Sequence, residues 1–374
     1  MQGKRGAFVR GVSRAPATAS AVGETSGSAP SRTAFLSTCP PDSGIGRGLR
    51  PWLVLVILLA ALGACTPADP AVDKRAAEAH VERADTLRSP LTAHPSPLIA
   101  PRFETFSVSD GLVSNEANVI LQDRQGFLWI GTFGGLSRFD GSTFTNFLHA
   151  PADSTSLAQN KVNTLFEDRA GVLWVGTNGG LDRFAPETET FTHYPHDPAD
   201  STSLSHDVVR AVVEGAAGAI WVGTRGGGLN RLDPATGILT RVRRTLSDPA
   251  SAEEEVHALL ANEDGTLWVG GSDGLALYDP STNAFSLVRR GRGTPGARPL
   301  PIVYTLCRDQ HGAIWAGTRT EGLFRYDPAT RAVVHYPNDP TTPGALGNPW
   351  VLSMIEDTTG TLWVGTNGAG LHRY

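Results

Sequence analysis

The sequence predicts an all-β fold, a β-propeller of four-stranded antiparallel blades. A Trp-containing segment recurs six times, at spacings of 45, 47, 47, 47 and 48 residues. Each unit alternates apolar and polar residues with a period of two, and none carries a helical apolar stripe. A repeat of this length with four short strands favours a propeller over a helical solenoid. The six tryptophans are Trp129, Trp174, Trp221, Trp268, Trp315 and Trp363.

Each repeat opens with a predicted hairpin. Residues 162–167 and 172–175 read as two strands, and residues 168–171 as the turn between them. In four repeats an Asp stands three residues before the turn Gly, where its carboxylate can accept local backbone N–H groups while the Gly takes a positive φ. These residues are Asp123, Asp168, Asp309 and Asp357, and repeats three and four have Gly215 and Asn262 there.

Two more strands complete the repeat, as in residues 135–139 and 190–194. A four-stranded blade cannot bury both faces alone, so we expect the Trp to fill the wedge against the neighbouring blade. The Gly two residues after each Trp is expected to let backbone come close. Cys307 falls in an otherwise apolar column of the repeats and is therefore expected to be a small buried hydrophobe.

The pattern D-x-x-G-x-[IL]-W-[VI]-G-T-x-x-G-L-x-R-[FY]-D resembles the two-component regulator propeller repeat, over residues 102–374. The segments FETFSVSDGLVSN at 103–115 and DPADSTSL at 197–204 are similar to that family as well, while Gly271 and Ala185-Pro186 depart from its pattern. The resemblance implies the extracytoplasmic sensor half of a bacterial hybrid two-component system, which often detects glycan breakdown products. It also implies further blades, an immunoglobulin-like domain, a membrane helix and a signalling output.

The N-terminal part predicts export. Residues 1–64 form a leader whose apolar core, residues 51–64, is short for a membrane span and has the length of a signal-peptide core. Leu62-Gly63-Ala64-Cys65 resembles a lipobox, which implies cleavage before Cys65 and acylation of its thiol; a plain signal peptide or an uncleaved anchor is the alternative. Residues 65–100 read as a linker and residues 101–374 as the propeller. We expect a periplasmic or otherwise extracytoplasmic protein held at the membrane.

Features at both ends of the sequence predict that the natural protein begins and ends at other residues. About fifty residues precede the apolar core, which suggests a start downstream of Met1. The sequence stops at Tyr374 inside the third strand of repeat six. We expect a fragment of a longer protein with a seven-bladed or double propeller; alternatively, residues 102–108 supply the outer strand of the sixth blade and close a six-bladed ring.

The composition argues against several classes of function. The formal net charge is −5 and the basic residues are scattered, so there is no footprint for nucleic acid. No catalytic motif, metal-ligand spacing or cofactor motif occurs, and the Gly-rich runs open strands rather than helices. The one basic cluster, residues 289–292, reads as a mobile loop or as a contact for an anionic sugar.

Candidate ligand-binding residues come from the expected geometry of a propeller. Loops between second and third strands, and the starts of first strands, gather on one face around the channel, and there the residue type changes from blade to blade. Amide, guanidinium, imidazole and phenol groups suit hydroxyl-rich or carboxylate-bearing ligands, although ordinary solvated rim residues would look the same. The candidates are Asn118, Asn163, Asn178, Arg210, Arg225, His257, Tyr304 and Arg319.

The leading hypothesis is a non-enzymatic sensor for a small polar ligand or oligosaccharide, without cofactor, metal or catalytic residue. A downstream kinase module and a homodimer are the expected partners. One alternative is a propeller lyase similar to streptogramin lyases, which would need His257 paired with Glu214 or Glu263 and a metal. A lipid-anchored scaffold for protein contacts is the other.

Overall fold

A computed structural model describes residues 104–242, 254–291, 296–339 and 341–374. Apart from two 3₁₀ turns, η1 (Val108–Asp110) and η2 (Ala216–Gly218), the regular elements of these ranges are antiparallel strands, which confirms the all-β prediction. None of the elements in these ranges is a helix able to cross a membrane. The predicted leader, Cys65 and the linker lie outside the described residues.

Each repeat forms one blade, and five blades have the expected four strands. The blades are blade 1, β1 (Ala117–Gln122), β2 (Leu128–Thr132), β3 (Leu136–Phe139) and β4 (Phe144–Phe147); blade 2, β5 (Val162–Glu167), β6 (Leu173–Thr177), β7 (Gly180–Ala185) and β8 (Thr190–Tyr194); blade 3, β9 (Val209–Glu214), β10 (Ile220–Gly226), β11 (Gly228–Leu232) and β12 (Leu239–Val242); blade 4, β13 (Glu254–Ala261), β14 (Leu267–Gly271), β15 (Gly274–Asp279) and β16 (Ala284–Leu287); blade 5, β19 (Val303–Arg308), β20 (Ile314–Thr318), β21 (Leu323–Tyr326) and β22 (Val333–Tyr336); and blade 6, β23 (Val351–Glu356), β24 (Leu362–Thr366) and β25 (Gly370–Arg373).

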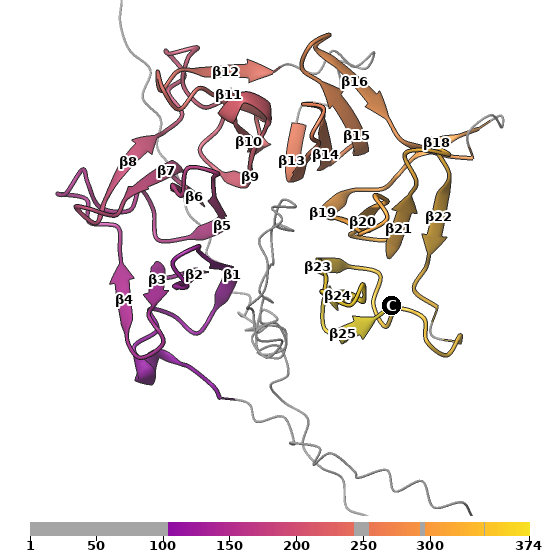
Figure 1. Ribbon diagram of the computed structural model, residues 1–374, viewed down its shortest axis with the longest axis horizontal. Helices are drawn as coiled ribbons and strands as arrows, with labels where there is room; N and C mark the ends of the chain where they lie inside the picture. Colours follow the sequence, from indigo (N-terminus) through magenta and orange to yellow (C-terminus); the bar gives the residue numbers. More distant parts are fainter. Residues whose placement is uncertain (1–103, 243–253, 292–295, 340) are drawn as a thin grey trace, which may run out of the picture. The chain divides into compact units, whose positions relative to one another are not determined.

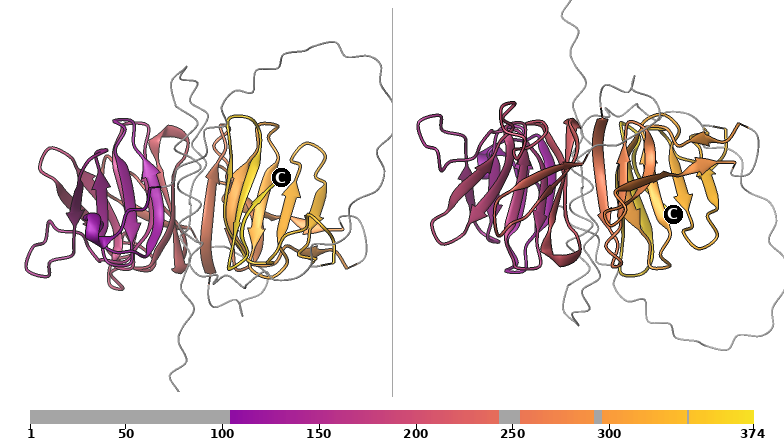
Figure 2. Two further views of the ribbon diagram at one scale, coloured as in Figure 1. Left: turned by 90° about the horizontal axis from the view of Figure 1, so that it is seen from below. Right: turned by 90° about the horizontal axis from the view of Figure 1, so that it is seen from above.

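The first strand of every blade lies innermost (Figure 1), and consecutive first strands contact one another from β1 through β23. Blades 3 and 4 are further joined into one eight-stranded sheet, because β10 pairs with β13 through Arg225 and Glu255. Figure 2 shows the strands running between two opposite faces, where the loops emerge. Residues at equivalent positions of different blades are therefore brought to the same face.

The repeated tryptophans pack between blades, as predicted. Trp129 lies edge-on to Phe184 of blade 2 at 5.1 Å between ring centroids, and Trp268 meets Tyr326 of blade 5 at 5.3 Å. The first five tryptophans are at most 4% exposed. Trp363 is half-buried, because no described blade follows it.

The Gly after each Trp serves the packing of side chains rather than of backbone. A Cβ on Gly176 would stand 2.7 Å from Val209 Cγ1 of the next blade and 2.5 Å from Thr164 Cγ2 of its own blade. The same relation links Gly223 to Val256 and Gly317 to Val351. Each blade thus admits the first valine of its successor into the space that a larger residue would fill.

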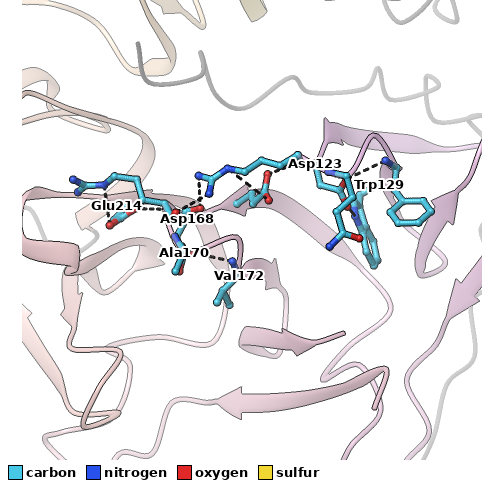
Figure 3. Close-up of polar contacts among 11 residues, drawn as sticks. Asp123, Trp129, Asp168, Ala170, Val172 and Glu214 are labelled. Carbon is cyan, nitrogen blue, oxygen red and sulfur yellow. Dashed lines mark hydrogen bonds and ion pairs between the residues drawn. The ribbon is translucent and has the colours of Figure 1, made fainter. Parts of the chain in front are cut away.

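The turn Asp makes the predicted backbone contacts and one more. Asp123 accepts the backbone N–H groups of Gln125 and Phe127 through Oδ1, and Gly126 has a positive φ of 95°. Its Oδ2 also accepts the indole N–H of Trp129 at 2.8 Å (Figure 3). The Asp column therefore anchors the Trp column through a contact that was not predicted from the sequence.

Three further expectations have clear outcomes. Residues 104–107 do not form an outer strand of blade 6: Phe106 packs on Phe139 and Phe144 of blade 1, so these residues cover their own blade. Part of the basic cluster is ordered as a short hairpin, β17 (Arg289–Arg290) with β18 (Arg298–Pro299). Cys307 is fully buried and belongs to the apolar cluster that includes Trp315, as predicted.

Candidate functional site: the mouth of the central channel

A cavity of ≈ 640 Å³ is lined by residues of the first strands of all six blades. We call its two ends the bulge end, where first strands begin, and the turn end, where they reach the Asp turns. The two ends differ in the residues that line them. Charged residues at the turn end form contacts between blades, whereas the residue type at the bulge end changes from blade to blade.

At the bulge end, each first strand carries a β-bulge at the same position. In β13, for example, Val256 pairs with Gly271 and Ala258 with Gly270, which leaves His257 as the extra residue. A bulge redirects a side chain and is common beside functional sites. The bulge residues, which we call the bulge ring, all line the cavity: they are Asn118, Asn163, Arg210, His257, Tyr304 and Leu352.

In blades 1 and 2, the bulge ring is engaged by the protein itself. The amide of Asn118 donates to the carbonyl of Val162 at 2.8 Å, and that of Asn163 to the carbonyl of Val209 at 3.0 Å. Asn163 also donates to Oδ1 of Asn178 at 2.9 Å. Asn118 and Asn163 are nearly fully buried, so this sector primarily holds neighbouring blades together.

In blades 4 to 6, aromatic rings follow one another around the mouth. His257 and Tyr304 stack at 4.3 Å between centroids with planes 9° apart. Tyr304 meets Trp350 edge-on at 5.8 Å, and the guanidinium of Arg319 lies 5.2 Å from the centre of the Trp350 ring. The candidates His257, Tyr304 and Arg319 are therefore brought together, with Trp350 as their link.

Arg225 joins this row from blade 3 through Glu255. Its Nε lies 3.1 Å from Glu255 Oε1, and Glu255 Oε2 lies 3.2 Å from Nε2 of His257, in a geometry that makes no hydrogen bond. Burial lowers the pKa of His257 to about 4; the Glu255 charge opposes this, and the charges of Arg210, Arg225 and Arg319 lower the pKa further. His257 is accordingly neutral at pH 7 and lies in the field of three arginines.

The same two positions contact each other across neighbouring blades at several places around the rim. The second-to-third-strand loop of one blade presents a residue to the residue just before the first valine of the next blade. Arg225 meets Glu255 as an ion pair, and Arg319 meets Trp350. Between blades 1 and 2 the cation and the ring change places, since the Lys161 ammonium lies 4.5 Å from the centre of the Phe133 ring.

Sequence reasoning missed one side of these pairs. Lys161, Glu255 and Trp350 occupy a column two residues before the bulge ring position, and this column also varies in residue type. Variation in that column was the available signal. The role of this column depends on contacts with a loop about thirty residues away in the sequence, and no local pattern predicts these contacts.

At the turn end, charged groups connect consecutive blades. Arg124 forms hydrogen bonds to the carbonyls of Asp168 and Arg169, and Glu167 accepts the backbone N–H of Arg124. Arg169 and Glu214 repeat the arrangement one blade later, at 3.0 Å between Nε and Oε1; Figure 3 shows Glu214 beside the turn of Asp168. These side chains are engaged in holding blades together.

The acid partners considered for a lyase lie away from the histidine. His257 is at the bulge level of its strand, whereas Glu214 and Glu263 are four and six residues further toward the turn end. At about 3.3 Å per residue these offsets correspond to roughly 13 and 20 Å. The described geometry therefore does not bring His257 together with either acid.

Comparison with known proteins matches three segments of the chain to a family of repeats. The profile described as two component regulator propeller matches residues 111–134, 156–179 and 345–368. Histidine kinase P4 of Formosa agariphila is 46% identical over 55 residues, which are 15% of this chain and 4% of that protein. The shared segment is thus a small part of a much longer protein.

Solved structures show the same fold. The extracellular domain assigned to the hybrid two component system BT4673 from B. thetaiotaomicron is 20% identical with a TM-score of 0.50, covering 68% of this chain and 37% of that one. PorZ of Porphyromonas gingivalis, a surface component of the type-IX secretion system, is 17% identical with a TM-score of 0.53, covering 68% and 38%. This chain spans well under half of either structure. The matched repeats resemble the two component regulator propeller repeat, and the chain shares the fold of these two structures.

Proposed function

We propose that this chain is a ligand-binding sensor propeller of a two-component signalling protein, exposed outside the cytoplasm, and that it binds a small polar ligand such as an oligosaccharide without converting it. The observation that carries the proposal is the bulge ring: one structural position, repeated in every blade and lining one cavity, holds six side chains of five chemical kinds. A position kept by packing alone would tend to repeat its residue type, as the Trp column does.

The comparisons support the sensor role. The family takes its name from two-component regulators, and the similar segment of Formosa agariphila belongs to a histidine kinase. A rigid ring with variable side chains at its mouth is a common binding architecture. In a longer protein, a downstream kinase module and a second copy of the chain would convert ligand binding into a signal.

The direct test is a binding screen with a readout for turnover. The 374-residue chain is mixed with an oligosaccharide panel, binding is followed by thermal shift and calorimetry, and the recovered ligand is examined by mass spectrometry. We expect at least one ligand to bind with its mass unchanged, and Tyr304→Ala to weaken binding at least tenfold. Cleavage or linearisation of a bound compound, including a cyclic depsipeptide lactone, would replace the sensor role with an enzymatic one.

A separate proposal concerns attachment to the envelope. We propose that Cys65 is acylated after removal of residues 1–64, as the lipobox-like Leu62-Gly63-Ala64-Cys65 suggests. Expression in a bacterial host with a radiolabelled fatty acid should label the wild-type chain and leave Cys65→Ser unlabelled. A labelled Cys65→Ser chain, or an unlabelled wild type that is nevertheless exported, would contradict acylation at this residue.

A further inference from the structure

Donor groups predominate on the blade 3 to blade 6 side of the bulge end. Arg210 lines the cavity, Arg225 and Arg319 lie outside its lining, and the charges of all three arginines act on His257. A guanidinium group can only donate hydrogen bonds, and it matches the two oxygens of a carboxylate. The described part of this sector thus presents three permanent cations.

Among the residues that the structure describes, few carboxylates offset these donors. Glu255 is the carboxylate inside the sector, and Arg225 already contacts it. Glu321, which follows Arg319 by two residues, forms its ion pair with Arg290 instead. Among the described groups, the charges that act on His257 are those of one carboxylate and three guanidinium groups.

Two buried polar atoms in the same row have no hydrogen-bond partner among the described residues. One is the indole N–H of Trp350, which can only donate, and the other is Nε2 of His257, whose side chain is 8% exposed. Leaving a buried polar atom unpaired destabilises a fold, so such atoms commonly have a partner from outside the protein, such as a water molecule or a ligand. Both lie next to Tyr304, which links them.

We propose that this sector of the channel mouth binds a carboxylate-bearing small ligand, with Arg319 facing the carboxylate and the row His257, Tyr304 and Trp350 holding the body of the ligand. The inference deepens the proposed function, on which its biological meaning rests, by assigning the ligand class to acids rather than to neutral sugars. Blades 1 and 2 take no part, because the amide N–H groups of Asn118 and Asn163 already donate to neighbouring valine carbonyls and the unpaired Oδ1 of Asn163 is an acceptor, which does not suit an anion.

The experiment compares each acid with its neutral ester. Glucuronate, trigalacturonate and sialyllactose, each beside its methyl ester, are titrated into the 374-residue chain by calorimetry at 20 and 200 mM salt. We expect at least one acid to bind tenfold or more tightly than its ester, and the difference to shrink at high salt. Equal affinity of acid and ester throughout the panel, or binding of no acid, would overturn the assignment.

Variants locate the effect in this sector. Arg319→Gln should weaken acid binding about tenfold and leave any ester binding unchanged, whereas Arg183→Gln removes the same charge from an exposed site on β7 and should change nothing. Thermal melts verify that both variants fold. The NMR titration of His257, identified through His257→Gln, adds a second readout, because a bound anion should raise its pKa above the value of about 4.

The outcomes separate the two proposals. Tight binding of neutral oligosaccharides that Arg319→Gln leaves unaffected would retain the sensor role and refute the acid site. Binding of acids followed by their chemical conversion would retain the acid site and refute the non-enzymatic sensor.

Discussion

The carboxylate of Asp168 accepts the indole N–H of Trp174 at 2.9 Å inside blade 2, where the Trp ring is fully buried. The other oxygen of the same carboxylate accepts the backbone N–H groups of Ala170 and Val172 (Figure 3). One side chain thus closes the turn and orients the ring that separates two blades. Asp357 and Trp363 repeat the bond at 2.8 Å in blade 6.

Asp168→Ala should lower the free energy of unfolding by about 3 kcal/mol, because three donors lose a charged acceptor and the indole is buried. Asp357→Ala is the matched control. Its Trp363 is only half-buried, so water can replace the lost acceptor and we expect a loss of about 1 kcal/mol. Urea unfolding followed by Trp fluorescence measures both; equal losses would show that burial of the indole does not set the cost.

Gly176→Ala should destabilise the chain by about 2 kcal/mol, since the added methyl would overlap Thr164 and Val209. Combining it with Val209→Ala, which vacates part of that space, should cost about 1 kcal/mol less than the sum of the single changes. Thermal or urea unfolding of the four proteins of this cycle provides the comparison. Strict additivity would mean that the next blade does not confine this glycine.

The contact between His193 and Asp182 stabilises the protein at low pH, and this stabilisation is lost as the pH rises. Its Nδ1 lies 2.7 Å from the buried Asp182 carboxylate, and this hydrogen bond raises the pKa of His193 above 6.5. A raised folded-state pKa contributes stability that is fully present below pH 6.5 and is lost as the pH rises through the folded-state value. His193→Gln should flatten the decline in Tm above pH 6.5, whereas the exposed His311→Gln should leave it unchanged. An undiminished decline in His193→Gln would refute this origin.

His257 has the opposite dependence. Its folded-state pKa is lowered to about 4, so the unfolded chain takes up the proton first as the pH falls below 6.5. Between pH 7 and pH 4.5 this difference should cost about 2 kcal/mol of stability in the wild type, and His257→Gln should lose that much less. Urea midpoints at the two pH values measure the difference; identical losses would place the acid sensitivity elsewhere.

The site could be located from the sequence only in part. The repeats are in phase, so one varied column, which includes Arg210 and His257, could be placed at the channel mouth, and the structure shows that it coincides with the bulges. Asn118 and Asn163 belong to the same column, but their contacts with the next blade could not be foreseen. Trp350 and Glu255 were missed because their partners lie on other blades.

The sequence by itself determined the strands, the turns and the periodic Trp, because each of these depends on residues within a few positions of one another: an Asp that closes its own turn, or a Gly that takes a positive φ. Only the tertiary structure decided which side chains meet across blades. Arg225 reaches Glu255, and Arg319 reaches Trp350, because backbone twist and the packing of valines against glycines bring distant segments to one rim. The burial that keeps His257 neutral likewise exists only once the blades are assembled.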